Sequence, residues 1–491
     1  MRVLLVNPKT SLIARAPSCP LGLLSIASYI QTKGFEVKIV DQTVKKENID
    51  AHIKKFNPDI VGVSVVSALA GKAAVQVSKA AKRRGKTVVW GGQIVSALPE
   101  LCFKEGCVDF VVIGEGEITF LELLTVIEIE GSHKEIPGLA YLENGKMQIN
   151  KPREFADLSV FPILDWSFLD VKRYYQTFFA GKKMLYLYAS KGCPGECSFC
   201  FNPNFHRSTQ RKRPIVQLVD EIEYLIKTVG ADSINFADEY WYPGKDDMLK
   251  FFDLIKERDL NFVWGIQTRL GILNRNDLQA MYDAGCRWIL FGIETGCKER
   301  VIAIKKGINL DKVKETFDNC REIGITTQSA FIIGYPDETE SELIETIRFA
   351  FSLKANLCPF TILYLQPGSE MFDYAVRNGK AQYPKSIKEV GLQYTGDAVS
   401  VNLSRVPDRD LKVIHYYTQW SAFADKESVN FNSFGIAKKM IFDTFKKIFR
   451  FGPTDFFRGS FVSMKQFLTV IYYAKAFPAI LKKYGLTNKK K

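Results

Sequence analysis

Short runs of β-branched and apolar residues alternate with amphipathic stretches over residues 1–130. This alternation predicts an α/β domain, a doubly wound parallel sheet with helices between the strands. The predicted strands are, in chain order, residues 3–6, 37–40, 60–66, 87–90 and 110–113. Two of them run directly into glycine-containing turns at 91–92 and 114–116. Folds of this class bind ligands at the carboxyl edge of the sheet, so these turns are candidate binding loops.

A second alternating pattern follows a connector over residues 131–180, which contains a hairpin-like stretch at 138–149. Its predicted strands are residues 184–188, 233–236, 262–266, 288–293, 329–333 and 360–365, with helices such as 216–227 and 310–323 between them. A closed barrel has about eight such repeats, so these six predict an open, partial (βα)6 barrel over residues 181–375. Residues 376–491 are rich in Phe, Tyr and Lys and are predicted to be a mostly helical, basic C-terminal region.

The composition is that of a globular protein large enough for several domains, with 491 residues of which 46% are hydrophobic and 25% charged. No secretory signal is recognisable at the start, and no apolar run reaches the roughly 18 residues that a spanning helix needs. We therefore expect a cytoplasmic protein. Ten cysteines without a secretion signal favour metal binding or reduced core thiols over a disulfide framework.

The positive charge is concentrated at the C-terminal end. Residues 431–491 hold 13 Lys or Arg against two Asp, which accounts for +11 of the net +13. Apolar residues recur at helical spacing among the lysines of 436–450, which predicts a basic amphipathic helix. Since basic residues near an anionic bilayer contribute about 1 kcal/mol each, we expect a peripheral contact with the inner membrane face that guides a large hydrophobic substrate to the barrel. The alternative is a helical cap that packs its apolar face on the barrel.

Three cysteines carry the strongest chemical signal in the chain. Cys193, Cys197 and Cys200 lie within eight residues on a loop rich in Gly and Pro, immediately after the strand predicted at 184–188. Three thiolates can hold three irons of a four-iron cluster and leave the fourth iron open to a small molecule, whereas an electron carrier uses four cysteines. A zinc site would need a fourth ligand, and the nearby candidate is His206. Scattered cysteines elsewhere are predicted to be small buried apolar residues: Cys286, Cys297, Cys320 and Cys358.

With Phe199 directly before the third cysteine, this loop resembles the radical S-adenosylmethionine superfamily, and the resemblance covers residues 184–370. It implies an anaerobic enzyme whose 4Fe-4S cluster cleaves S-adenosylmethionine to a 5′-deoxyadenosyl radical, which abstracts hydrogen from an unactivated carbon. It also implies cofactor contacts at the carboxyl ends of later strands: Asp238 and Glu239 for the ammonium of the methionine moiety, Arg269 for its carboxylate, Glu294 for the ribose and Gly334 for the adenine. The alternatives are a salt bridge at the barrel rim for Asp238, Glu239 and Arg269, and a strand-end turn for Glu294 and Gly334.

The first domain resembles, over residues 1–130, the cobalamin-binding domain that precedes many radical S-adenosylmethionine domains. The resemblance implies that the glycine turns admit the corrinoid, with further contacts from neighbouring polar residues: Ser64, Ser67, Gly91, Gly92, Gln93, Gly114, Glu115 and Gly116. One departure concerns the Asp-x-His-x-x-Gly loop of well-known binders, because no histidine follows Asp41-Gln42-Thr43. The cobalt would then have no histidine ligand from that loop. A domain that kept the fold and lost the cofactor is the alternative.

Together the two domains resemble the anaerobic magnesium-protoporphyrin ester cyclase-like group. The resemblance implies methylation of an unactivated carbon on a lipid-like or tetrapyrrole-like substrate, with methylcobalamin as methyl donor and an external electron donor such as flavodoxin or ferredoxin. The alternative within the group is radical ring closure or oxidation without methyl transfer. An RNA-modifying methylthiotransferase is disfavoured, and with it a nucleic-acid partner, because Cys19, Cys102 and Cys107 lack the spacing of that family's N-terminal cluster motif. A non-catalytic cobalamin or iron-sulfur sensor would give no reason for an open iron.

Overall fold

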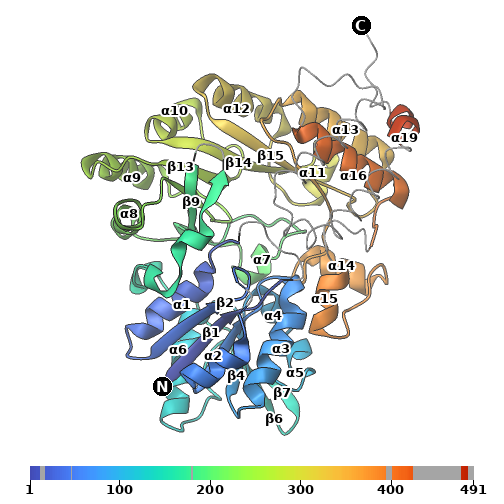
Figure 1. Ribbon diagram of the computed structural model, residues 1–491. Helices are drawn as coiled ribbons and strands as arrows, with labels where there is room; N and C mark the ends of the chain where they lie inside the picture. Colours follow the sequence, from blue (N-terminus) through green and yellow to red (C-terminus); the bar gives the residue numbers. More distant parts are fainter. Residues whose placement is uncertain (11–16, 46, 179–180, 394–400, 424–476, 485–491) are drawn as a thin grey trace, which may run out of the picture.

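The computed structural model describes residues 1–10, 17–45, 47–178, 181–393, 401–423 and 477–484. Two sheets, each covered by helices, lie one above the other in Figure 1. The first sheet has the order β2-β1-β3-β4-β5-β6-β7 and the second the order β16-β15-β14-β13-β12-β9-β8. The two-domain α/β architecture expected from the hydrophobic pattern is confirmed.

The first domain is a doubly wound parallel sheet. Its parallel strands are β1 (Arg2–Asn7), β2 (Glu36–Asp41), β3 (Ile60–Ser64), β4 (Thr87–Gly91) and β5 (Phe110–Val112). The helices are α1 (Leu21–Gln31), α2 (Ile49–Phe56), α3 (Gly71–Lys82), α4 (Gln93–Ala97), α5 (Pro99–Phe103) and α6 (Gly116–Glu128). Apolar residues of α1 and α6 pack together in one core cluster, and those of α2 and α3 share another with α4 and α5.

The hairpin assigned to the connector belongs to the first sheet. Strands β6 (Leu139–Glu143) and β7 (Lys146–Ile149) pair antiparallel with each other, and β6 pairs antiparallel with β5. Without them β5 would expose a row of unpaired backbone donors and acceptors. The first structural unit therefore extends to about residue 150, beyond the predicted boundary at 130.

The second sheet is the predicted open barrel. Its parallel strands are β9 (Gly181–Leu187), β12 (Ser233–Phe236), β13 (Val263–Thr268), β14 (Cys286–Glu294), β15 (Thr326–Ile333) and β16 (Phe360–Ile362), with β8 (Gln176–Phe178) antiparallel at one edge. Its helices are α8 (Ile215–Glu223), extended by a π-helical turn at Tyr224–Val229, and α9 (Lys245–Glu257), α10 (Arg275–Asp283), α11 (Lys298–Ala303), α12 (Leu310–Ile323) and α13 (Glu340–Ser352). Strands β16 and β8 are the ends of this sheet, so it is not closed.

Segments after the barrel hold the two domains together. Helices α14 (Glu370–Arg377) and α15 (Ile387–Gln393) lie beside the first domain in Figure 1. Gly71 of α3 packs against the carbonyl of Ile387 so closely that a Cβ there would collide with it. Lys388 Nζ lies 2.8 Å from Glu105 Oε2. One apolar cluster contains residues of the first domain, the barrel and these helices, so the relative placement of the domains is part of the folded core.

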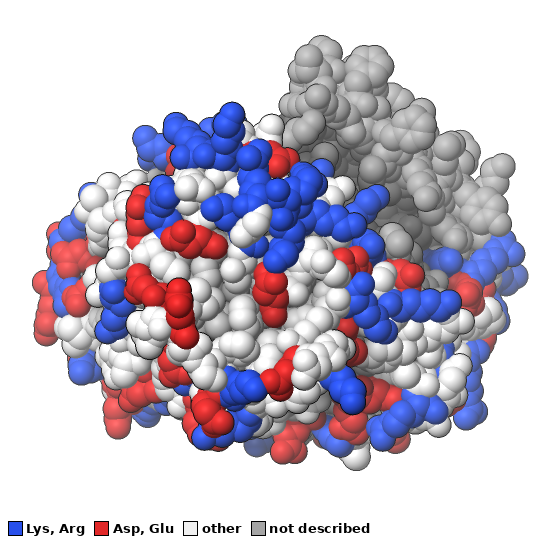
Figure 2. All heavy atoms as spheres, turned by 90° about the horizontal axis from the view of Figure 1, so that it is seen from below, with Lys and Arg blue, Asp and Glu red and all other residues white. Residues whose placement is uncertain are grey.

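The basic C-terminal region is described only in part. Helix α16 (Asp408–Phe423) and helix α19 (Phe477–Lys483) pack together on the barrel, with Tyr484 1% exposed. Lys483 Nζ lies 2.7 Å from Glu340 Oε1 and 2.9 Å from Asp410 Oδ2, so this end of the segment docks on α13 and α16. The amphipathic helix predicted within 436–450 lies outside the described residues. On the face shown in Figure 2, acidic and basic side chains are interspersed, with one gathering of Lys and Arg at the edge.

Across the described ranges, no helix is long and apolar enough to cross a bilayer. All ten cysteines are free thiols, and the four scattered ones that we predicted to be small core residues are buried.

Candidate active site

The cysteine loop connects the two strands of a short ribbon at the carboxyl edge of the barrel. Strand β10 (Ser190–Lys191) pairs with β11 (Arg211–Lys212), and the three predicted cluster ligands lie between them. Backbone N–H groups point at two of the sulfurs, from Gly195 to Cys193 Sγ and from Asn202 to Cys200 Sγ, both at 3.4 Å. Such donors stabilise sulfur in its anionic form.

The three thiols also interact with one another electrostatically. Burial, with a smaller contribution from the neighbouring Cys197 and Cys193, raises the pKa of Cys200 to about 11. Burial likewise raises the pKa of Cys193, with Cys197 adding to the effect. Thiols in this setting are ionised when a metal binds them. The donor set, three sulfurs with backbone N–H donors, fits a four-iron cluster.

The zinc alternative required His206 as a fourth ligand, and this imidazole faces elsewhere. Its Nδ1 lies 3.4 Å from Glu115 Oε1 of the first domain, and its Nε2 lies 3.9 Å from Glu239 Oε1. The ring packs edge-on against Phe205. Within the described residues, the site therefore has three protein sulfurs and no nearby imidazole for a fourth position.

Arg269 follows β13 and lies against the cysteine loop. Its Nη1 is 3.6 Å from Cys197 Sγ, and its Nη2 donates to the carbonyl of Lys306. A Cβ on Gly195 would collide with this guanidinium, so the glycine permits the approach. In the part of the chain that the structure describes, no carboxylate forms a hydrogen bond with Arg269. A half-buried guanidinium without an acidic partner fits the carboxylate of a bound ligand.

The two acidic residues after β12 have different surroundings. Asp238 is 1% exposed, and its carboxylate accepts from the Ala189 backbone and from Ser190 Oγ. Burial raises the pKa of Asp238 to about 7. Glu239 accepts from the Gly192 N–H at 3.2 Å and is 37% exposed. Of the predicted ammonium acceptors, Glu239 is therefore the one left open beside the cysteine loop, while Asp238 fixes the start of that loop.

Glu294 ends β14 in a conformation that L-residues seldom adopt, with φ +73°. Its Oε1 lies 3.0 Å from Lys306 Nζ, and both side chains are largely buried. A Cβ on Gly292 would press against the Glu294 carboxylate, and the pairing of β14 with β15 is irregular at this point. Backbone strain of this kind is concentrated at functional sites, which supports a ligand-facing role for Glu294.

Gly334 directly follows the next strand, β15, and has φ +87°, as expected of a strand-end turn. Its N–H donates to Glu338 Oε2 at 2.5 Å, and burial raises the pKa of Glu338 to about 7. The following Tyr335 is fully buried, and its ring lies 6.2 Å from that of Phe199 in an edge-on arrangement. Phe199 thus anchors the cysteine loop on the end of β15.

The first domain presents its candidate binding loops at the carboxyl edge of its sheet. Ser64 ends β3 beside Gly91, its partner in β4. Ser67 accepts from the Leu69 N–H and so caps a short helical turn. Gly92 has φ +111°, and a Cβ there would press on the backbone of Val65. These contacts give Ser67 and Gly92 structural roles in shaping the edge and leave Ser64 half-buried beside it.

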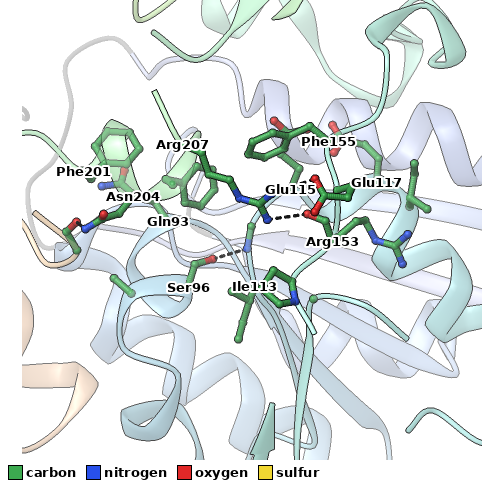
Figure 3. A pocket seen from close by; sticks show the side chains of 18 of the residues that line it. Gln93, Ser96, Ile113, Glu115, Glu117, Arg153, Phe155, Phe201, Asn204 and Arg207 are labelled. Atoms are coloured by element: carbon green, nitrogen blue, oxygen red, sulfur yellow. Dashed lines mark hydrogen bonds and ion pairs between the residues drawn. The ribbon is translucent and has the colours of Figure 1, made fainter. Parts of the chain in front are cut away.

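A cavity of about 290 Å³ lies between the two domains (Figure 3). It is lined by the loops after β4 and β5, by the chain after β7 and by the segment that follows the third cysteine, including Gln93, Gly114, Glu115, Phe155, Phe201 and Arg207. The buried Nε2 of Gln93 has no hydrogen-bond partner among the described residues. Gly114 has φ +83° and open space where a side chain would be. An unpaired amide donor and an open glycine turn fit a corrinoid, whose rim carries amide groups.

The loop after Asp41, in which well-known binders carry the histidine that ligates cobalt, lies at the edge of the sheet. Asp41 ends the outermost strand β2, and its carboxylate accepts from Asn7, Thr43 and Tyr174. Strand order places the switch point between β1 and β3, where the segment between β1 and α1 begins. The sequence of that segment also contains no histidine, so the expectation that cobalt has no histidine ligand from the loop after Asp41 is unchanged.

Glu115 contributes to the site mainly by contacts between domains, and Gly116 by close packing within the first domain. Burial would raise the pKa of Glu115, but the hydrogen bond with His206 and the charges of Lys191 and Arg211 lower it to about 2. Gly116 lies so close to Ile26 of α1 that a Cβ would be 2.9 Å from its Cδ1. The sequence did not identify Lys191 and Arg211 as site residues. Their carboxylate partners lie about 75 to 95 positions earlier in the chain, and no sequence pattern indicates such a distant pairing.

Comparison with known proteins agrees with both halves of the site. Residues 14–124 match the B12 binding domain, and residues 187–350 match the radical SAM superfamily. The chain is 33% identical to an uncharacterized methyltransferase, PH0819, of Pyrococcus horikoshii, over 77% of this chain and 84% of that protein. It is 26% identical to the anaerobic magnesium-protoporphyrin IX monomethyl ester cyclase of Rubrivivax gelatinosus, over 77% of this chain and 72% of that one.

A solved structure shares the fold over nearly the whole length. The radical S-adenosylmethionine methyltransferase TsrM of Kitasatospora setae, with cobalamin and a 4Fe-4S cluster bound, superposes with a TM-score of 0.68 at 19% identity, covering 89% of this chain and 94% of that chain. The chain is thus an enzyme whose cofactors are a 4Fe-4S cluster, S-adenosylmethionine and cobalamin, and it belongs to the radical S-adenosylmethionine enzymes that carry a cobalamin-binding domain.

Proposed function

We propose that the protein transfers a methyl group to an unactivated carbon of a hydrophobic substrate, lipid-like or tetrapyrrole-like. The observation that carries the proposal is the cavity between the domains. One side of the cavity is the glycine turn of the first domain at Gly114. The other side is formed by Phe201 and Asn204, shortly after the third cysteine of the cysteine loop. A corrinoid held there lies next to the cysteine loop, so a radical formed on one side can be methylated from the other.

The residues of the chain have separate tasks in this proposal. The cluster supplies the electron that cleaves S-adenosylmethionine, and the corrinoid supplies the methyl group. Cys193, Cys197 and Cys200 hold the cluster, and Arg269 and Glu239 bind the two charged ends of the methionine moiety. For the nucleoside the proposed contacts are Phe199, Glu294 and Gly334. For the corrinoid they are Ser64, Gly91, Gln93 and Gly114.

Radical ring closure is the second candidate, because one relative is a cyclase. Anaerobic turnover with product analysis separates the two. Methylation should produce 5′-deoxyadenosine and S-adenosylhomocysteine in similar amounts, since one S-adenosylmethionine is cleaved and another donates its methyl group. Deoxyadenosine without S-adenosylhomocysteine would reject methyl transfer and favour ring closure or oxidation.

Corrinoid binding should depend on the open turn at Gly114. Gly114→Val forces a branched residue to φ +83°, a strain of about 1–3 kcal/mol, and extends a side chain into the space left for the corrinoid. We expect the variant to fold and to lose most hydroxocobalamin in equilibrium dialysis. Gly145→Val, in the β6–β7 turn at φ +75° and also facing open space, is the matched control and should bind normally. Equal binding by both variants would exclude this turn from the corrinoid site.

We infer a peripheral membrane contact from the +11 charge of residues 431–491. In liposome co-sedimentation, full-length protein should bind vesicles that contain anionic lipid, and binding should weaken with salt. A variant lacking 431–476 keeps the docked helix α19 region and should stay in the supernatant. Equal sedimentation of both forms, or none with anionic vesicles, would leave the capping role as the function of this segment.

An external reductant completes the proposed reaction, because the cluster must be reduced before it cleaves S-adenosylmethionine. We propose a one-electron protein donor of the flavodoxin or ferredoxin class. Reduced flavodoxin should support deoxyadenosine formation at a rate that saturates with its concentration, and a linear dependence would indicate non-specific reduction.

A further inference from the structure

The base of the cysteine loop is a short ribbon with two facing cations, Lys191 and Arg211, whose carboxylate partners among the described residues lie outside the barrel domain. Strands β10 and β11 are only two residues long, and Lys191 lies directly opposite Arg211 in their antiparallel pairing. Like charges at such positions destabilise the pair. The barrel fixes the ends of the ribbon, through Asp238 at Ser190 and through Glu221 at Arg213, but in the described part of the chain it provides no carboxylate to the two cations. The ribbon therefore needs anionic partners.

Both anionic partners come from the first domain. Glu117 Oε1 lies 2.6 Å from Lys191 Nζ, with side-chain exposures of 4% and 18%. Glu115 ion-pairs with Arg211 and lies 3.9 Å from Lys191 Nζ. Ser25 of α1 donates to Glu117 Oε1 at 2.7 Å and fixes its orientation. Because these groups are shielded from solvent, salt screens their attraction much less than it screens surface pairs.

The segment that provides these two carboxylates, between β5 and the first turn of α6, also faces the cavity. Glu115 and Glu117 flank Gly116 at the start of α6, and both line the cavity together with Gly114. Figure 3 shows the two carboxylates beside Phe155 at this wall of the cavity. A single short loop of the first domain thus contacts the cavity on one side and the base of the cysteine loop on the other.

We propose that Glu115 and Glu117 clamp the base of the cysteine loop and thereby set the position of the cluster relative to the corrinoid. Lys191 and Arg211 are then positioning residues, which act through the loop that they close. Removing one partner leaves the other charge buried and unpaired, a larger loss than that of an exposed ion pair. This inference rests on the proposed placement of the cluster on the three cysteines.

Hydrogen exchange tests the clamp in the full-length protein, reconstituted with iron and sulfide and loaded with hydroxocobalamin. Lys191→Met and Glu117→Gln should each raise amide exchange in residues 190–212 at least about tenfold. The reversed pair Glu117→Lys/Lys191→Glu should restore most of the protection, because the attraction across the boundary is rebuilt. With substrate, the single variants should release more deoxyadenosine per methylated product, since the radical forms but the methyl donor is displaced.

Lys388→Met is the matched control. It removes the Lys388–Glu105 pair, which joins α15 to the same first domain but lies away from the cysteine loop. Its exchange in 190–212 should equal that of the wild type. If Lys191→Met does not fold, the isosteric Glu115→Gln serves in its place.

Unchanged exchange in the single variants, or a reversed pair no better protected than they are, would overturn the clamp. Either outcome is distinct from failure of the proposed function. A misplaced cluster would appear as iron retained after the cysteines are changed, and a wrong reaction would appear in the product ratio of the wild type.

Discussion

Cys200→Ala is expected to strip most of the iron from the anaerobically reconstituted protein and to abolish cleavage of S-adenosylmethionine. The wild type should hold about one four-iron cluster per chain. Two remaining thiolates leave two irons without protein ligands, and the Asn202 N–H that points at Cys200 Sγ loses its acceptor. Iron and sulfide analysis, electron paramagnetic resonance of the reduced protein and chromatography of deoxyadenosine measure the three consequences.

Cys320→Ala is the matched control, because Cys320 is fully buried on α12 and removed from the loop. The same change there removes one sulfur from the core and should leave iron content and cleavage at wild-type levels. Iron and cleavage activity retained by Cys200→Ala would refute the assignment of the cluster to this loop. Cys193→Ala and Cys197→Ala should behave as Cys200→Ala does, since each is proposed to hold one iron.

The hydrophobic pattern predicted the fold well where burial is regular. The strand at 233–236, Ser-Ile-Asn-Phe, alternates polar and apolar residues with the period of two that a strand produces, and it is found at the predicted residues. Helix 310–323 also matches the predicted range. Its apolar residues recur at a spacing that fits only a helix.

The pattern was less informative where an element's partner is distant in sequence. The hairpin at 139–149 was recognised as a hairpin, but only the edge of β5 explains why it belongs to the first sheet. The same limit applies to the site. Three cysteines in one loop are visible in the sequence, whereas the clamp at Glu115 and Glu117 exists only because folding places β5 beside that loop. Asp238 is a related case. A carboxylate at the end of a strand gives the same sequence pattern whether it faces a ligand or, as here, accepts a hydrogen bond from Ser190.

Arg269→Ala is expected to weaken S-adenosylmethionine binding at least about 30-fold, because truncating one partner of a buried charge pair costs about 2–5 kcal/mol. The guanidinium lies 3.6 Å from Cys197 Sγ, so its loss should also make the cluster harder to reduce and shift the midpoint potential to more negative values. Arg269→Lys keeps the charge but not the planar fork, and its affinity for S-adenosylmethionine should lie between those of the wild type and Arg269→Ala. Equilibrium binding under anaerobic conditions and a redox titration followed by electron paramagnetic resonance give the two readouts.

Gly195→Ala provides the second variant for this assignment. A methyl group at Gly195 would occupy the space of the Arg269 guanidinium and push it from the cysteine loop, while all three cysteines remain. The variant should therefore keep its iron and lose affinity for S-adenosylmethionine, in parallel with Arg269→Ala. A purely structural role, through the bond to the Lys306 carbonyl, would predict a different result, because Arg269 would then affect stability and not affinity. Normal binding in both variants, combined with a lowered melting temperature, would favour that structural role and exclude Arg269 from the carboxylate site.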